Sequence, residues 1–437
     1  MRSNSVISII VFLLIYPSLG FAIPFDGLWH KIREEDPSLQ EDSQNLIALT
    51  FEKKRAELSW FPTVGIEGRA FSTNDAGLNF NSDLGQRQIN TTDFLPGNLN
   101  NPGFHTFETA SLLLDLPLYE GGAKLAMSKA IAANLDSLSE ENKAKRTDAY
   151  IGSAKSYGKA ISLSSAITRL ETLQKKLQST IGTYRIGNKS NLIGYSGLLG
   201  MKNLANRTES LLTEMKSSLS EAIGELSARS GLESSWTLQL ESIDSFIDKY
   251  LPSPSANVTR LSLREKVSEV DALAASQESA LARAVYLPKI GLFARENLTN
   301  GNRDSATSFT GGVYLKWQLF DPNHIDRISE AEAREGAKKA HVKVVGLDAS
   351  IQSAANTQNE IALKKNLKLL TESEAFLEEQ SQVTQKLFQN GSVSALQLAE
   401  MLNRRIDLIL QLQTMESKLI TVRADQVKLF SSGSQYE

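Results

Sequence analysis

No proline interrupts the chain between Pro117 and Pro252, and this long stretch constrains the fold more than any other feature of the sequence. It is dense in Ala, Leu, Lys, Glu, Ser and Gln, so nothing in its interior must break a helix. A helix from about Ala123 to Arg185 would be roughly 90 Å long. Apolar residues at 3-4 spacing predict a coiled-coil seam at Leu163, Ile167, Leu170, Gln174, Leu177, Ile181 and Tyr184.

The residues before this helix alternate in character with period two, which indicates a strand. One face carries Ala110, Leu112, Leu114, Leu116 and Leu118, and the other carries Thr109, Ser111, Leu113 and Asp115. The strand leads through Gly121 and Gly122 directly into the helix. The sequence therefore predicts a membrane-type strand joined to a coiled-coil-type helix.

The first 22 residues have the pattern of a signal peptide, with Arg2, an apolar run and a small-residue cleavage site at Ala22. The mature chain is expected to begin near Ile23. The sequence contains no cysteine, which excludes a lipid-anchored mature terminus, disulfides and thiolate metal sites.

Composition excludes several classes of function. The formal charge of −3, with Lys and Glu interspersed, provides no basic stripe for nucleic acid. The four histidines lack ligand spacing, and we find no phosphate loop or nucleophile elbow. We therefore expect no enzyme, no catalytic residue, no metal and no cofactor. Beyond the signal peptide there is no run of 18 apolar residues, so any membrane insertion would use strands.

The sequence repeats itself once. Residues 283–295 align with residues 57–69, matching Pro62 with Pro288, Gly65 with Gly291 and Arg69 with Arg295. Each half therefore reads as helix, strand, loop, strand, long helix, turn and long helix. Residues 74–105 are predicted to be an exposed loop with nothing to build a core from. The second return helix has apolar heptad positions at Leu398, Leu402, Ile409, Leu412 and Leu419.

Four strands cannot close a barrel, and an open sheet in a bilayer would leave the amides of its edges unsatisfied. Three copies of the chain would supply twelve strands, an even number within the known range of barrels. A closed oligomer with cyclic symmetry is expected.

The sequence resembles the TolC-like outer-membrane efflux proteins over nearly the whole mature chain. The segments that carry this resemblance are Trp60-Phe-Pro62, Tyr286-Leu-Pro288, Pro117-Leu-Tyr-Glu-Gly-Gly122, Trp317-Gln-Leu-Phe-Asp321, Tyr184-Arg-Ile-Gly187 and Leu387-Phe-Gln-Asn-Gly391. The resemblance implies an α+β membrane protein, in which each chain contributes four strands to a trimeric, twelve-stranded barrel in the outer membrane. That barrel would continue into a coiled-coil helical barrel in the periplasm. A periplasmic adaptor of an inner-membrane pump would meet its closed end.

The expected segments follow from the repeat and the resemblance together. They are a signal peptide (1–22), an N-terminal periplasmic helix (23–61), the first strand pair of the barrel (62–118), the first long helical hairpin (119–231), an equatorial segment with a short helix (232–287), the second strand pair (288–320) and the second long hairpin (321–437).

The resemblance also implies a pore constriction near the turns of the hairpins. In this family acidic side chains lie six and nine residues after the second turn glycine, which here are Gln397 and Glu400. The partner aspartate of the first hairpin falls on Ile193, and the aromatic of the closing network falls on Phe388. We therefore expect hydrophobic packing and amide contacts to close this end more than ion pairs. Alternatively, Gln397 and Glu400 are ordinary solvated helix positions.

The turns themselves are expected to be the tips that contact the adaptor. Their residues are Gly187, Asn188, Lys189, Asn390, Gly391 and Ser392. In every case they close one helix before the next begins.

The sequence thus predicts a passive exit duct for efflux or type I secretion, embedded in outer-membrane lipid and opened when the adaptor shifts the inner hairpins relative to the outer ones. Two alternatives remain. A periplasmic adaptor would have one hairpin flanked by compact β domains, and the duplication counts against it. A structural envelope coiled coil would lack lipid-facing alternation, and residues 309–319 count against it.

Overall fold

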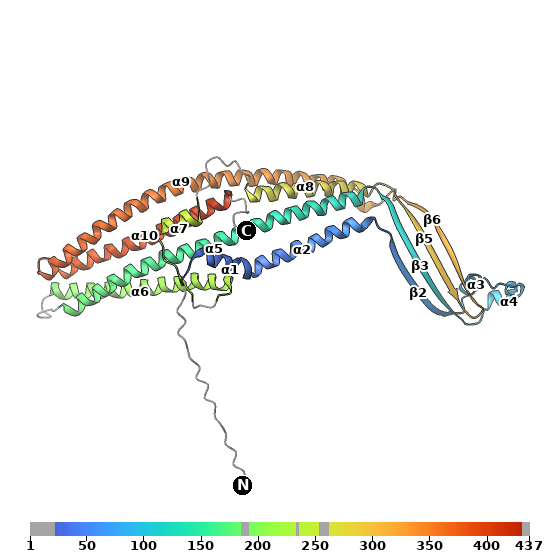
Figure 1. Cartoon of the computed structure of the whole chain (residues 1–437), viewed down its shortest axis with the longest axis horizontal. Helices are drawn as coiled ribbons and strands as arrows, with labels where there is room; N and C mark the ends of the chain where they lie inside the picture. The colour runs from blue at the N-terminus through green and yellow to red at the C-terminus, as the bar shows by residue number, and fades with distance from the viewer. Residues whose placement is uncertain (1–21, 185–191, 233–235, 253–261, 431–437) are drawn as a thin grey trace, which may run out of the picture. The chain divides into compact units, whose positions relative to one another are not determined.

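The computed structural model describes residues 22–184, 192–232, 236–252 and 262–430 (Figure 1). All but the last residue of the expected signal peptide lie outside these ranges. The chain divides into two compact units. The first comprises Met1–Ser43, Asn142–Leu263 and Gly346–Glu437, and the second comprises Gln44–Glu141 and Arg264–Val345. Among the described residues, no helix combines the length and the hydropathy that crossing a bilayer would require.

The second unit contains a four-stranded antiparallel sheet in the order β2-β3-β5-β6. Its strands are β2 (Thr63–Thr73), β3 (His105–Glu120), β5 (Lys289–Asn300) and β6 (Ser305–Lys316). Strands β2 and β5 each begin one residue after a proline, Pro62 and Pro288, which cannot donate to a ladder. Within the described residues, β2 and β6 each have one edge without a partner strand.

The register of the sheet separates apolar from polar residues. Val64 lies opposite Leu114, Leu114 opposite Ala294, and Ala294 opposite Gly311. The face that contains this row is called the apolar face, and it also carries Ile66, Ala110, Leu112, Leu116, Leu292, Leu298, Phe309, Val313 and Leu315, with Glu108 and Glu296 as charged exceptions. The polar face carries Glu67, Arg69, Thr109, Ser111, Asp115, Arg295, Asn297, Thr299, Thr310, Tyr314 and Lys316, with Phe71, Phe107, Leu113 and Phe293 as apolar exceptions. The predicted alternation in β3 is confirmed.

Strand β3 passes into helix α5 (Ala123–Thr183) through a turn that only glycine fits. Gly121 and Gly122 have φ angles of +65° and +81°. A Cβ on Gly121 would also lie 2.5 Å from the carbonyl oxygen of Ala284. Both the positive φ angle and the lack of space therefore exclude a side chain at this position.

The connection between β2 and β3 is not the exposed loop that the sequence predicted. It contains helix α3 (Ala76–Gly85), a 3-10 turn η2 (Thr91–Phe94) and helix α4 (Pro96–Asn100). Asn79, Asp83 and Gln86 are buried there. The prediction was wrong because it counted apolar residues, whereas this segment packs through polar ones.

The first unit is built on two helical hairpins. Helix α5 is followed by α6 (Leu192–Ser230), and α9 (Arg327–Gln389) is followed by α10 (Ala395–Phe430). One hydrophobic cluster joins α5, α6 and α10 and includes Leu170, Met201 and Leu398. It contains the predicted seam of α5, so that prediction is confirmed. The heptad positions predicted for α10 are buried as well.

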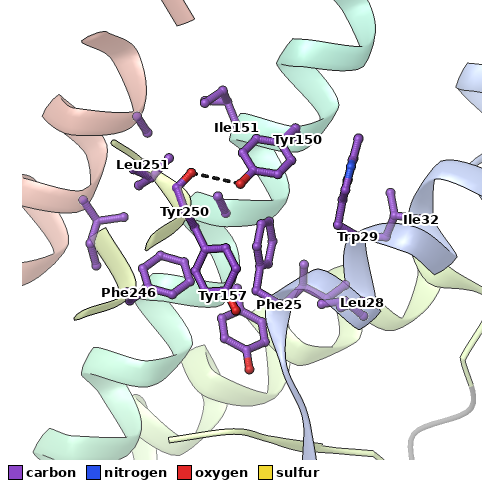
Figure 2. Packing of buried hydrophobic residues seen from close by; sticks show 14 of the residues in the cluster. Phe25, Leu28, Trp29, Ile32, Tyr150, Ile151, Tyr157, Phe246, Tyr250 and Leu251 are labelled. Carbon is purple, nitrogen blue, oxygen red and sulfur yellow. Dashed lines mark hydrogen bonds between the residues drawn. The ribbon is translucent and has the colours of Figure 1, made fainter. Parts of the chain in front are cut away.

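A second cluster in this unit is rich in aromatic residues (Figure 2). It joins α1 (Phe25–Glu35), α5 and α7 (Ile243–Tyr250). The ring of Phe25 lies 5.0 Å from that of Tyr250 and 5.2 Å from that of Tyr150. The hydroxyl of Tyr150 donates to the carbonyl oxygen of Tyr250 at 2.9 Å, and that of Tyr157 donates to Ile23. Burial raises the pKa of Tyr157 to about 12.

The remaining described elements belong to both units. Strands β1 (Ala22–Ile23) and β4 (Thr237–Leu238) pair in parallel. Helix α2 (Pro37–Glu57) begins at the predicted proline and ends in the 3-10 turn η1 (Leu58–Trp60). In the second unit, helix α8 (Leu263–Ala284) precedes β5, and the 3-10 turn η3 (Pro322–His324) precedes α9.

Candidate functional site at the hairpin turns

The turn between α9 and α10 is closed by its own backbone. The amide of Ser392 donates to the carbonyl of Leu387 at 2.8 Å, and the amide of Gly391 donates to that of Phe388 at 3.0 Å. Gly391 has a φ of +74°. This is the Schellman arrangement that ends helices at a left-handed glycine. The predicted tip residues Asn390, Gly391 and Ser392 are all exposed.

Gln397, a predicted constriction residue, caps helix α10. Its side-chain oxygen accepts from the backbone amide of Ser394 at 2.8 Å, and the Ser394 hydroxyl accepts from the backbone amide of Gln397 at 3.3 Å. This reciprocal pair is a capping box. The motif Ser-x-x-Gln at the start of a helix is the sequence signal for this role.

The other predicted constriction residues lie in different surroundings. Glu400 accepts from Arg404 at 2.7 Å, one turn later on the same exposed helix face. Ile193 is 75% exposed near the start of α6. Phe388 is half-buried, and its ring lies 5.5 Å from that of Tyr184 at the end of α5. The structure therefore brings Phe388 to the first hairpin, and it gives Glu400 a partner on its own helix. Gly187, Asn188 and Lys189 lie outside the described residues.

Helices α6 and α10 approach each other closely beside the turn. A Cβ on Gly197 would lie 2.6 Å from the Cβ of Ala395, closer than two such atoms can come. Met201 and Leu398 pack in the same cluster, and both are buried. The absence of a side chain at Gly197 thus sets the distance between the two hairpins at this level.

Ion pairs join the helices within a few turns of this end. Arg169 of α5 donates from Nη1 to both carboxylate oxygens of Glu374 of α9 at 3.0 Å. Arg207 of α6 donates from Nη2 to Asp407 of α10 at 2.7 Å. A further set centres on Glu378 of α9, which lies 3.8 Å from Lys176 of α5 and also contacts Arg405 of α10.

We call these contacts the interhelical ion pairs. The expectation that hydrophobic packing and amide contacts close this end more than ion pairs rested on the two family offsets after Gly391, and it stays a prediction. The charged pairs lie instead at other positions on the same helices. In the Arg169–Glu374 and Arg207–Asp407 pairs the partners are 205 and 200 residues apart in the chain, so no local spacing could reveal them.

The surroundings of Glu378 in α9 and of Glu416 in α10 shift the pKa values of these two carboxyl groups in opposite directions. Burial opposes ionisation of Glu378, but the hydrogen bond from Gln382 and the charges of Arg405 and Lys176 outweigh it and lower its pKa. Burial raises the pKa of Glu416, although its hydrogen bond from the Ser162 hydroxyl, at 2.6 Å, acts against the shift. Glu378 is therefore suited to hold a permanent charge.

No group of three or more His, Asp or Glu side chains in residues 22–184, 192–232, 236–252 and 262–430 is placed to hold a metal ion. The contacts that join the hairpins at this end include ion pairs and a ring contact.

Several solved structures of channels share this fold. CusC, whose structures concern transmembrane channel formation, matches with a TM-score of 0.75 and 14% identity over 96% of this chain and 95% of that one. The CmeC outer-membrane channel of Campylobacter jejuni matches with a TM-score of 0.76 and 10% identity, over 94% of this chain and 88% of that one. The open state of the MtrE outer-membrane channel of Neisseria gonorrhoeae matches with a TM-score of 0.72 and 12% identity, over 94% of this chain and 89% of that one.

The sequence itself matches no protein-family model and no curated protein. At identities of 10 to 14%, the structural likeness establishes the fold. The expected likeness to the fold of outer-membrane channels is thereby confirmed for the single chain.

Proposed function

We propose that this chain, which has the fold of the TolC-like outer-membrane channels, is one subunit of a passive exit duct in the outer membrane. Three copies would form the duct, and a periplasmic adaptor would connect it to an inner-membrane pump for efflux or type I secretion. The chain itself would carry out no chemistry. Energy for transport would come from the pump.

The observation that carries this proposal is the two-faced sheet with open edges. Its apolar face exposes Ile66, Phe309 and Val313, which suits contact with lipid. Strands β2 and β6 keep an unpaired edge in the described residues, and a bilayer cannot satisfy such edges. Pairing between copies would satisfy them and close the barrel, with the polar face lining its lumen.

Helix α9 supports the same assembly. Its only buried residues in the described chain are Glu360 and Ser381, whereas Leu369, Phe376 and Val383 are exposed at intervals of seven. This spacing is that of a heptad seam, and no other segment of the described residues covers it. A neighbouring copy in a helical barrel would cover it, as the expected periplasmic tunnel requires.

We place the gate of the duct at the hairpin turns. An adaptor that contacts the tips, Gly187 to Lys189 and Asn390 to Ser392, would move α9 and α10 relative to α5 and α6. Such a movement must break the Arg169–Glu374 pair, and it would separate Phe388 from Tyr184. Gln397, Glu400 and Ile193 complete the proposed constriction. Charged partners can be rehydrated when they separate, so these links suit a gate that opens repeatedly.

The seven segments expected from the sequence would then have distinct roles. The strand pairs (62–118 and 288–320) would form the barrel and the hairpins (119–231 and 321–437) the tunnel. The N-terminal helix (23–61) and the equatorial segment (232–287) would brace the tunnel from outside, after removal of the signal peptide (1–22).

The test is the conductance of the purified mature protein in a planar bilayer, together with the mass of its detergent complex. We expect a trimer with small, flickering conductance that rises in the variant Gln397→Ala/Glu400→Ala. The matched control is Gln352→Ala/Glu372→Ala, which removes the same two side-chain types from exposed positions on α9 and should leave conductance unchanged. A monomer that never inserts would instead favour the periplasmic adaptor or the structural coiled coil.

A further inference from the structure

The segment between β2 and β3 packs against the loop end of the sheet (Figure 1). We call residues 76–100 the cap; they comprise α3, η2 and α4. A Cβ on Gly85 would lie 3.2 Å from the Cβ of Thr299, and a Cβ on Gly301 would lie 2.8 Å from the ring of Phe107 and 2.6 Å from the side-chain amide of Gln86. Thr299 and Phe107 both lie on the polar face. The cap therefore packs on the polar face, near the loop end of the strands.

Arg303, in the turn between β5 and β6, holds the cap in place. Its guanidinium donates to both carboxylate oxygens of Asp93, at 2.7 and 2.8 Å, and lies 3.0 Å from a carboxylate oxygen of Asp83. It also donates to the backbone carbonyl of Gln88 at 2.6 Å. Bidentate pairs of this kind are the strongest charged hydrogen bonds that side chains form. We call this set of contacts the Arg303 latch.

Gln86 strengthens the same attachment. Its side-chain oxygen accepts from the backbone amides of Arg303 and Asp304, at 2.9 and 3.0 Å, and the residue is 1% exposed. Arg87 donates to the carbonyl of Thr307 in β6 at 2.7 Å. Several hydrogen bonds and ion pairs thus join the cap to the end of the sheet.

Helix α3 buries polar side chains and exposes apolar ones, which is the reverse of the usual arrangement. Asn79 and Asp83 are buried, whereas Leu78 is 51% exposed and Leu84 is exposed as well. Phe94, Leu95 and Phe104 are also exposed. A helix normally buries its apolar side against its own domain. Here these apolar side chains are exposed instead. The hydrogen bonds that hold the cap to the sheet can be replaced by hydrogen bonds to water when they break.

We propose that the cap is a lid over the mouth of the duct at the loop end of the barrel, and that the Arg303 latch holds it closed. This inference rests on the proposed function, because the polar face lines a lumen only if the apolar face contacts lipid. The lid forms a constriction distinct from the gate at the hairpin turns. Its exposed apolar side chains narrow the lumen and disfavour water there, as in hydrophobic gates. Lipid cannot cover them, because the cap lies on the face that does not contact lipid.

A reversible covalent lock tests the lid directly. The chain has no cysteine, so Gly85→Cys/Thr299→Cys introduces the only possible disulfide. The Cβ atoms, 3.2 Å apart, need to separate by only a few tenths of an ångström to reach the spacing of about 3.5–4.5 Å found in disulfides. In the triple variant that also carries Arg303→Ala, the disulfide holds the cap on the sheet although the latch is lost. An effect of Arg303→Ala on the position of the cap is thereby separated from an effect on folding.

In planar bilayers, we expect Arg303→Ala to raise conductance by roughly two-fold or more, because the lid leaves the lumen. The triple variant should stay at the wild-type value when oxidised and rise to that of Arg303→Ala after reduction. Arg334→Ala is the matched control: it removes the same charge from an exposed position on α9, where the side chain pairs with Glu330 rather than with the cap or the sheet, and it should not produce this rise. Each single cysteine variant should be insensitive to reduction.

The outcomes separate the two proposals. If the disulfide forms but conductance is the same before and after reduction, the cap is not a lid, although the exit duct stands. If trimers form and no disulfide appears, the cap does not lie on the polar face and the lid is again excluded. If wild-type protein neither forms trimers nor inserts, the proposed function fails first. Should Arg303→Ala not assemble, the same comparison is made in Gly85→Cys/Thr299→Cys with Arg303 retained, at high salt, which screens the latch; equal oxidised and reduced conductance there would overturn the lid.

Discussion

Arg423 of α10 donates from Nη1 to a carboxylate oxygen of Glu360 in α9 at 3.0 Å, and their side chains are only 5% and 11% exposed. Lys364, one turn along α9, also contacts Glu360 at 2.8 Å. Nearby, Gln426 donates to the hydroxyl of Thr357 at 3.1 Å. Two long helices without a break could slide past each other, and these buried polar contacts fix one register between them.

Replacing Arg423 with alanine should therefore destabilise the protein strongly. It leaves the Glu360 carboxylate without its buried partner, which costs about 3–5 kcal/mol when a buried pair is broken. Arg404→Ala is the control, because its pair with Glu400 is exposed and should contribute less than about 1 kcal/mol. The denaturant midpoint of each variant measures the difference, and similar midpoints for both would contradict the argument.

The interhelical ion pairs predict a charge-swap rescue. Glu374→Arg places two cations together on α5 and α9, so the turn end should open more often and conductance should rise. The double variant Arg169→Glu/Glu374→Arg restores an opposite pair and should return conductance toward the wild-type value. Planar-bilayer recordings of the three proteins test this, and a double variant as open as the single one would exclude the pair from gating.

The close approach at Gly197 predicts a position-specific effect of one methyl group. Gly197→Ala should destabilise the protein by about 1–3 kcal/mol, because the new Cβ meets Ala395 and forces α6 and α10 apart. Gly200→Ala, one turn along the same helix, finds its nearest neighbour, Leu396, at an ordinary distance of 3.6 Å. This control should instead stabilise the helix by about 0.5–1 kcal/mol. Thermal unfolding followed by circular dichroism distinguishes the two signs.

The capping box separates two roles of Gln397. Ser394→Ala removes the N-cap of helix α10 without altering any predicted constriction residue. It should lower the free energy of unfolding by about 1 kcal/mol. If Gln397 contributes to the constriction, Gln397→Ala will raise conductance and Ser394→Ala will not. Equal conductance changes in both variants would mean that Gln397 acts only as a cap.

The Arg303 latch predicts an acid limit for the closed lid. The hydrogen bonds from the Arg303 side chain and the Asn90 amide hold the pKa of Asp93 below its ordinary value of 3.8. A carboxylate with a lowered pKa contributes its full stabilisation above that ordinary value and loses it as the pH falls through the folded-state pKa. The charged groups around it are Arg303 and Asp83, of which Arg303 stays protonated throughout.

Conductance attributable to the lid should accordingly be constant from neutral pH down to about pH 4 and rise only at lower pH. Asp93→Asn should open the lid at neutral pH and remove the contribution of Asp93 to this acid response. An opening transition centred between pH 5 and 7 would contradict the assignment to Asp93, because no carboxylate with a lowered pKa titrates there.

Local pattern alone determined much of this protein. Apolar spacing located the seam through Leu170 and the heptads through Leu402, and alternation located β3, because side-chain direction repeats every 3.6 residues in a helix and every two in a strand. Pro37, Pro62 and Pro288 marked where elements begin, since proline lacks an amide to donate. The Ser394–Gln397 cap was also readable, as a motif of four residues.

Only the tertiary structure decided which charges meet and which polar residues are buried. Arg423 and Glu360 are 63 residues apart in the chain, and Arg303 and Asp93 are 210 apart. No periodicity relates such positions, because their distance depends on how whole helices and strands pack. The cap was read as a loop for the same reason: Asn79, Asp83 and Gln86 look like solvated residues until the sheet supplies partners that make their burial favourable.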